Sequence, residues 1–274
     1  MPTLSFTRLA PSPAPDRWCL VLHGILGSKT NWRTLAQKAL PRCPGWGFVL
    51  CDLRNHGDSQ GFDPPHDLAA AASDLLALTQ SLGHPTPAVI AHSYGAKVAL
   101  QFADLDPRVG RVLVVDSNPG ARPDHAGSEG TLRVLDTLGS MPARFDRRED
   151  FVAALEAAGH PRALATWLAT NLVHDPDGGL RSRIEVPVIR AMLDDYFHRD
   201  LWPVVEGVWV RRRIDFLVGG RSTVLDAADL ARLEALQADR PDCVRLTVAP
   251  TASHWVHVDA PDLTLGAMVA LLTG

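Results

Sequence analysis

The stretch between residues 88 and 103 constrains the fold of this chain more than any other. Ala88-Val89-Ile90 has strand character, and residues 96–103 have helical character. Only Ala91-His92-Ser93-Tyr94-Gly95 connects them, so the backbone must turn very sharply. Small side chains are needed where a strand and a helix pass so closely, and Gly95 meets that need. The five residues fit the pattern G-x-S-x-G with Ala91 in place of the first glycine, which predicts a serine on a strained strand-to-helix turn. An ordinary turn that contains a serine would look the same, so the rest of the chain must decide.

Length and charge narrow the class of protein. The 274 residues suffice for one large α/β domain or two small ones. A net charge of -4 argues against nucleic acid or an anionic membrane as a partner. The one basic run, Arg211-Arg212-Arg213, precedes an apolar strand and is interpreted as its solvated entrance.

Membrane and secretion signals are not evident. The sequence contains no run of about 18 apolar residues, so we expect no stable membrane insertion. Residues 1–16 lack a basic segment followed by an apolar one, and the expected location is therefore cytoplasmic. The four cysteines have no C-x-x-C pair and are expected to be reduced: Cys19, Cys43, Cys51 and Cys243.

Apolar runs of strand length alternate with helical patterns on both sides of a helical middle section. Strands are expected at 4–9, 18–22, 46–51, 88–90, 111–115, 214–218 and 244–248, and helices at 31–40, 67–82, 96–103, 227–238 and 261–272. This alternation predicts an α/β fold with a mostly parallel sheet and helices on both faces.

The alternation stops between residues 120 and 206. Four helical patterns occur there without a convincing core strand, at 130–138, 148–158, 161–172 and 186–197. We therefore predict a core of residues 1–119 and 207–274. A helical lid, residues 120–206, is inserted after the strand that ends at Asp116.

Residues at predicted strand ends can assist Ser93 in acyl transfer, which needs a base, an acid and oxyanion donors. His254 follows the last strand and is the preferred base, with His257 as an alternative. His23 and His92 are interpreted as packing residues. The oxyanion donors would be the backbone N–H groups of Tyr94, which follows the serine, and of Ile25 in the loop after residues 18–22.

Two aspartates compete for the role of the acid. Asp116 ends the strand that follows the serine's helix, and Asp226 lies in the loop after residues 214–218. Both keep the order serine, acid, histidine. Asp226 could instead be the N-cap of the next helix, a common use of aspartate. Asp116 is therefore preferred.

Four motifs in one order carry a family resemblance. They are His23-Gly24-Ile25-Leu26-Gly27-Ser28, Asp52-Leu53-Arg54-Asn55-His56-Gly57-Asp58-Ser59, His92-Ser93-Tyr94-Gly95-Ala96-Lys97 and Ser253-His254-Trp255. The chain resembles the α/β-hydrolase superfamily from about residue 20 onward, most of all its YbfF-like esterase branch and related abhydrolase-domain proteins. The resemblance implies an eight-stranded core, a helical lid, and serine hydrolysis of esters or thioesters through an acyl-enzyme. It also implies Asp116 as the acid and Ser222 as a fourth member of its hydrogen-bond network.

Several side chains near these motifs bear on the shape of the site. Tyr94 stands where methionine is frequent and is expected to reshape the acyl pocket, while Ala91 and Ala96 replace glycines. Asp52 and Arg54 are expected to pair as scaffolding. Five lid residues could line an acyl tunnel or pack the lid against the core: Trp167, Leu168, Leu172, Met192 and Tyr196.

We therefore expect a serine hydrolase that acts on small carboxylic esters with short or medium acyl chains. No cofactor is needed, and a metal pair at His254 and His257 would lack a third ligand. Carbon–carbon bond hydrolysis and acyl transfer can use the same residues and stay open. The fold can also serve as a non-catalytic ligand- or partner-binding protein. Oligomeric state is not predicted.

Overall fold

A mostly parallel sheet forms the centre of the computed structural model, which describes residues 2–12, 14–207 and 212–274. Seven strands lie in the order β1-β3-β2-β4-β5-β8-β9, and only β1 runs antiparallel to its neighbour. The strands are β1 (Phe6–Leu9), β2 (Arg17–Leu22), β3 (Trp46–Cys51), β4 (Ala88–His92), β5 (Arg111–Val115), β8 (Arg213–Gly219) and β9 (Val244–Ala249). This arrangement confirms the predicted α/β-hydrolase fold class.

The number of strands differs from the expected eight. The described residues before β2 form one strand of the sheet, β1. The sheet therefore has seven strands in the part of the chain that the structure describes.

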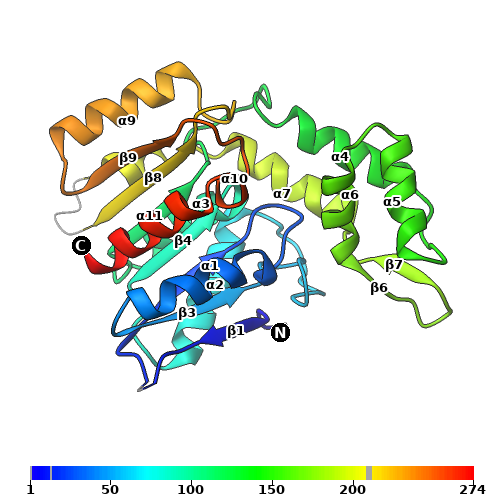
Figure 1. Cartoon of the computed structure of the whole chain (residues 1–274), viewed down its shortest axis with the longest axis horizontal. Helices are drawn as coiled ribbons and strands as arrows, with labels where there is room; N and C mark the ends of the chain where they lie inside the picture. The colour runs from blue at the N-terminus through cyan, green and yellow to red at the C-terminus, as the bar shows by residue number, and fades with distance from the viewer. Residues whose placement is uncertain (1, 13, 208–211) are drawn as a thin grey trace.

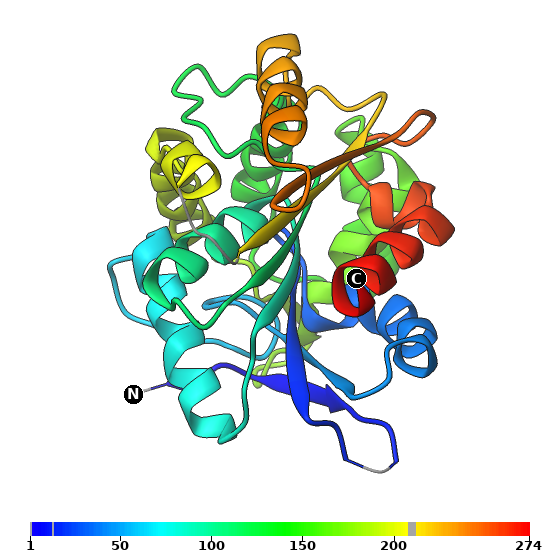
Figure 2. The same ribbon diagram turned by 90° about the vertical axis from the view of Figure 1, so that its left-hand side faces the viewer.

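Helices cover both faces of the sheet (Figure 2). α1 (Arg33–Ala39) and α11 (Pro261–Thr273) lie on one face, and α2 (Leu68–Leu82), α3 (Tyr94–Leu105) and α9 (Ala227–Asp239) lie on the other. Side chains along β5 alternate between the two resulting cores: Leu113 and Val115 pack on the first face, Val112 and Val114 on the second. Strands buried on both faces appear in the sequence as continuous apolar runs, which is why they were predictable.

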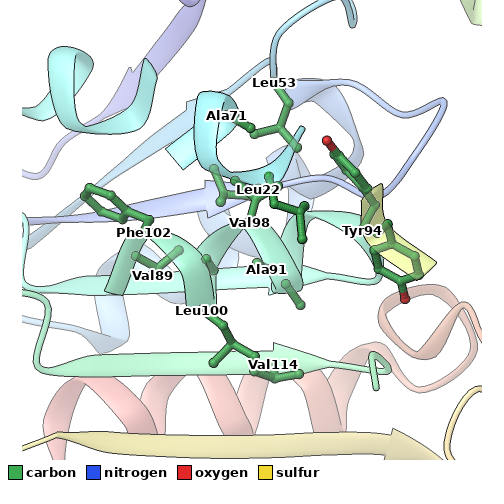
Figure 3. Packing of buried hydrophobic residues seen from close by; sticks show 14 of the residues in the cluster. Leu22, Leu53, Ala71, Val89, Ala91, Tyr94, Val98, Leu100, Phe102 and Val114 are labelled. Carbon is green, nitrogen blue, oxygen red and sulfur yellow. The ribbon is translucent and has the colours of Figure 1, made fainter. Parts of the chain in front are cut away.

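The core beneath α3 holds the serine turn in place. Val98, Leu100 and Phe102 of α3 pack against Val89 and Ala91 of β4 (Figure 3), and all five are fully buried. Burial of each large aliphatic or aromatic side chain contributes about 1.5–3 kcal/mol. The turn between β4 and α3 is therefore anchored on both sides by well-packed elements.

The chain between β5 and β8 projects beyond the carboxyl ends of the strands, to the right in Figure 1. It contains α4 (Glu129–Ser140), α5 (Arg148–Ala157), α6 (Arg162–Leu168), α7 (Val186–His198) and α8 (Trp202–Glu206). It also contains an antiparallel pair, β6 (Leu172–His174) and β7 (Leu180–Ser182), so an all-helical insertion was a wrong prediction. The intervening Asp-Pro-Asp-Gly-Gly sequence, with positive φ at Gly178 and Gly179, was the overlooked turn signal.

The basic run before β8 is not a solvated entrance. Arg211 lies outside the described residues, and Arg212 and Arg213 are buried. The guanidinium of Arg213 pairs with Asp215 at 2.6 Å, and the Arg212 Nε donates to the carbonyl of Val109 at 3.1 Å. Long arginine stems pack easily at a strand end, provided that their head groups find acceptors.

No helix within the described ranges is both long and apolar enough to span a bilayer. The remaining short elements are α10 (Val256–Asp259) and three 3-10 turns, at Lys29–Trp32, Leu40–Arg42 and Ala169–Asn171.

Lys97 fastens α3 to both ends of the segment between β5 and β8. Its ammonium donates to the carbonyls of Gly120, Tyr196 and Arg199 at 2.7, 2.7 and 3.0 Å. These bonds use all three of its donors. Burial lowers the pKa of Lys97 to about 7, whereas the three carbonyls favour the charged form. A fully buried lysine on the serine's own helix thus holds the projecting segment.

We expect Lys97→Met to lower the free energy of unfolding by roughly 3 kcal/mol, because three buried carbonyls would lose their donor. Urea denaturation of the variant and the wild type would measure the difference. Lys38→Met is the matched control, since Lys38 is exposed on α1, and it should change the value by less than about 0.5 kcal/mol. Equal midpoints for both variants would contradict this role of Lys97.

Candidate active site

Ser93 occupies a strained turn between β4 and α3. Its φ and ψ are 52° and -122°, a conformation that costs a non-glycine residue about 1–3 kcal/mol. The Ser93 N–H donates to the carbonyl of Val115 at 3.0 Å, which extends the ladder between β4 and β5 and holds the strained conformation. The half-buried side chain lines a cavity of about 460 Å³.

The loop after β2 lies directly against this turn. A Cβ atom on Gly95 would meet the carbonyl oxygen of His23 at 2.2 Å, and one on Gly24 would meet Nδ1 of the buried His92 ring at 2.9 Å. Glycine is therefore required on both sides of the contact. The contact brings Ile25, the residue after Gly24, to the cavity that Ser93 lines. Tyr94 begins α3, where N–H groups lack partners within the helix.

Asp116 brings together two of the predicted residues. Its Oδ2 accepts from the Nδ1–H of His254 at 2.7 Å and from the hydroxyl of Ser222 at 2.6 Å, and its Oδ1 accepts from the N–H of Gly219 at 2.8 Å. The carboxylate is completely buried, so these donors replace water. Donation from Nδ1 leaves Nε2 of His254 as the acceptor nitrogen.

Asp116 is itself held by the next strand. Its φ of 47° is unusual for a residue with a side chain, and its N–H donates to the carbonyl of Leu217 in β8 at 2.9 Å. Ser93 and Asp116 are therefore positioned in the same way. Each stands one residue beyond a strand, in a left-handed conformation that a neighbouring strand holds.

Asp226, the alternative acid, caps helix α9 instead. Its carboxylate accepts from the N–H of Asp229 at 2.9 Å and from Arg122 at 2.7 Å. The structure thus places Asp116, and not Asp226, at the imidazole of His254.

The cavity has walls from both parts of the chain. Ser93, Ser222 and His254 line it from the core, and Leu164 and Trp167 of α6 line it from the projecting segment. Of the five candidates for an acyl tunnel, Trp167 alone is among these lining residues. The other four are packed in the hydrophobic core: Leu168, Leu172, Met192 and Tyr196.

Tyr94 does not reshape the pocket as expected, because its side chain turns into the core. Figure 3 shows Tyr94 among the buried side chains. The residue is 1% exposed, and its ring lies 6.0 Å from that of Tyr196 and 6.3 Å from that of His56, between centroids. The Tyr94 side chain is therefore not among the residues that line the cavity beside Ser93.

Comparison with known proteins agrees with the fold. A model of the alpha/beta hydrolase family matches residues 19–267. The chain belongs to the alpha/beta hydrolase family.

Curated relatives of this hydrolase include a lipase and an esterase. It is 29% identical to the mouse sn-1-specific diacylglycerol lipase ABHD11 over 258 residues, covering 92% of this chain and 79% of that protein. It is 25% identical to the esterase YbfF of Escherichia coli over 250 residues, covering 91% and 90%. A marine microorganism esterase of known structure shares the fold, with a TM-score of 0.84, 24% identity, and coverage of 99% of this chain and 100% of that one.

Buried histidines hold the loops of the hydrolase site. The Nε2–H of His92 donates to the backbone carbonyl of His254 at 2.9 Å, and the His257 ring stacks on Trp32 at 4.8 Å between centroids. His23 accepts from the N–H of Leu53 at 3.0 Å, which joins the loops after β2 and β3. Burial lowers the pKa of His257 to about 4 and that of His92 well below its usual range.

The loop after β3 is scaffolding, but with a different ion pair from the expected one. The Asp52 carboxylate pairs with the Lys29 ammonium at 2.6 Å, whereas Arg54 pairs with Asp74 of α2 at 2.7 Å. The expected pairing of Asp52 with Arg54 was therefore wrong. Gly57, at a φ of 50°, lets the loop pass over the buried carboxylate, which a Cβ atom there would meet at 2.3 Å.

No group of three or more histidine, cysteine or acidic side chains that could hold a metal ion occurs among residues 2–12, 14–207 and 212–274. The four cysteines are free thiols, three of them buried.

The buried histidines predict a loss of stability in acid. For His257 the pKa falls from 6.5 to about 4 on folding, so the unfolded chain binds more protons between these pH values. The free energy of unfolding should therefore fall as the pH drops from 6.5 toward 4, by about 1.4 kcal/mol per pH unit for this group.

His257→Phe removes the titrating group but keeps a ring against Trp32. It should reduce the acid-induced loss by roughly 3 kcal/mol over this range, measured by urea denaturation at several pH values. His198→Phe is the control, because His198 is exposed, and it should leave the loss unchanged. The same pH dependence in all three proteins would contradict the assignment.

Proposed function

We propose that this protein is a serine esterase that cleaves carboxylic esters with short or medium acyl chains. The observation that carries the proposal is the Asp116 carboxylate. It holds the ring of His254 at the cavity that Ser93 lines. The esterase and lipase among its relatives support an ester as the substrate.

In the proposed first step, Nε2 of His254 takes the proton of the Ser93 hydroxyl while Oγ attacks the ester carbonyl. The N–H groups of Ile25 and Tyr94 would stabilise the oxyanion, each by about 3 kcal/mol. When the tetrahedral intermediate collapses, His254 gives its proton to the leaving alkoxide. Water, deprotonated by the same nitrogen, then attacks the acyl-enzyme and forms a second tetrahedral intermediate. Its collapse breaks the bond to Ser93 Oγ, which takes the proton back from His254, and the acid is released.

The proposed role of Asp116 is to orient His254 and to stabilise the imidazolium. The aspartate keeps the proton of neutral His254 on Nδ1, so Nε2 can act as the base. The Ser222 hydroxyl, 2.6 Å from the same oxygen, would be the fourth member of the network. Because it binds the carboxylate from the cavity wall, it limits the orientations that Asp116 can adopt.

Residues 120–206 are proposed to act as a lid. Leu164 and Trp167 lie over the catalytic cavity, and the three bonds of Lys97 fasten both ends of the segment to α3. A cover of this kind excludes water from the reacting atoms and strengthens the electrostatic interactions among them.

Ser93→Ala should lower kcat/KM for p-nitrophenyl butyrate by about 10³-fold or more, because it removes the proposed nucleophile. Hydrolysis of p-nitrophenyl esters from acetate to palmitate would measure both the loss and the preferred chain length. Ser73→Ala, an exposed serine of α2, is the control and should retain wild-type rates. Equal turnover by Ser93→Ala and the wild type would refute the nucleophile.

Asp116→Asn should lower kcat by about 10³–10⁴-fold, since an amide cannot stabilise the imidazolium or hold the correct tautomer. Asp226→Asn should keep kcat within about twofold, because asparagine also serves as an N-cap. Steady-state kinetics on p-nitrophenyl butyrate would separate the two aspartates. A collapse of kcat in Asp226→Asn alone would reverse the assignment.

A further inference from the structure

A second cavity, of about 400 Å³, adjoins the catalytic one. Its walls include Pro161, Ala163, Leu164 and Trp167 on one side and Trp255 and Val258 on the other, and we call it the Trp groove. Leu164, Trp167 and Trp255 also line the catalytic cavity. The two cavities therefore share walls.

The two tryptophans form the boundary between the cavities. Their rings meet edge to face, with centroids 4.7 Å apart and planes at 76°. Trp167 belongs to α6 of the proposed lid, and Trp255 directly follows His254. Because both rings line both cavities, a ligand that occupies the two cavities together would contact both tryptophans.

Among the polar side chains that line the Trp groove, Asn31 and Asp259 are already engaged, whereas Nδ1 of His257 is buried without a hydrogen-bond partner among the described residues. The Asp259 carboxylate accepts from the N–H of Ser253 at 2.8 Å and from its hydroxyl, and Asn31 Oδ1 accepts from the N–H of Ser28 at 2.7 Å. His257 is stacked on Trp32, and its lowered pKa keeps it neutral at pH 7. What the groove offers a ligand is therefore mainly aromatic and aliphatic surface.

We propose that the Trp groove binds a hydrocarbon arm on the alcohol side of the ester. This inference rests on the proposed esterase function. The leaving oxygen must receive its proton from His254, so the alcohol part lies on the His254 side of the carbonyl. Trp255 and Val258, which follow His254 within four residues, line the Trp groove, so the groove adjoins the His254 side of the catalytic cavity. The substrates would be esters of apolar alcohols, with the acyl chain in the catalytic cavity.

The expected signature is chain-length dependence on the alcohol side. With the acid part fixed as acetate, kcat/KM should rise about three- to fourfold for each methylene that enters the Trp groove, from ethyl to octyl acetate. A ladder of p-nitrophenyl esters with growing acyl chains tests the other side of the carbonyl separately.

Ala163→Phe tests the Trp groove, because Ala163 is an exposed residue of α6 and a phenyl ring there would fill the groove. The variant should lower the octyl-to-ethyl ratio of kcat/KM at least tenfold. Thr166→Phe, exposed on the same helix outside both cavities, should keep the wild-type ratio. Thermal unfolding of both variants would verify that they are folded.

Three results would overturn the proposal. If Ala163→Phe changes only the acyl ladder, the Trp groove holds the acid part. If neither ladder distinguishes Ala163→Phe from Thr166→Phe, the groove holds neither part. If kcat/KM of the wild type does not change from ethyl to octyl acetate while hydrolysis still depends on Ser93, the Trp groove does not bind the alcohol part. The proposed esterase function would then still stand.

A binding measurement separates the groove from the chemistry. 1-Octanol, the product alcohol of octyl acetate, should bind to the wild type with a change in tryptophan fluorescence, since Trp167 and Trp255 form the boundary. Its Kd should rise at least tenfold in Ala163→Phe and stay unchanged in Thr166→Phe. Octanol binding without hydrolysis of any ester would reject the esterase and retain an alcohol-binding groove. Equal Kd values in the two variants would reject the groove.

Discussion

The close contact between Gly95 and the carbonyl of His23 is the constraint on which the rest of the site depends. Because Gly95 has no Cβ atom, the loop after β2 can lie directly against the turn that carries Ser93. That contact brings Ile25 to the cavity that Ser93 lines, next to the turn that Tyr94 continues into α3. A displacement of about 1 Å at such a point can cost two orders of magnitude in rate. Any residue larger than glycine at position 95 would cause such a displacement.

The sheet supplies the remaining precision through its hydrogen bonds. Ser93 and Asp116 end adjacent strands, and each is held in a left-handed conformation by the strand beside it. Histidines in the same region have different roles that follow from burial. The His254 side chain is 31% exposed and its Nδ1 lies on Asp116, whereas His92 and His257 are buried and hold the loop that carries it. One cluster thus combines a candidate proton carrier with groups that stay neutral.

The segment between β5 and β8 is attached to the core near Ser93 and also lines the cavities. Lys97 fastens it to the helix that begins beside Ser93, so its position is coupled to the turn. Through Leu164 and Trp167 it then contributes to both cavities. Trp167 and Trp255 come from the segment and from the His254 loop, respectively. The contact between the two tryptophan rings therefore depends on the distance between the segment and the His254 loop.

Local patterns in the sequence alone determined most of the elements of the fold and the position of Ser93. The strands, the main helices, the turn at Ser93 and the family follow from periodicity, turn chemistry and ordered motifs, which act over a few residues. Contacts between distant segments were decided only by the tertiary structure. Lys29 rather than Arg54 meets Asp52, and Tyr94 turns inward. The pairing of Asp116 with His254 across 138 residues is the exception, because the order of the strand ends already favoured it. The Trp groove also exists only because α6 meets α10 in space. Side-chain pairing depends on where elements that are distant in the sequence come together in space, and a local sequence pattern does not encode that position.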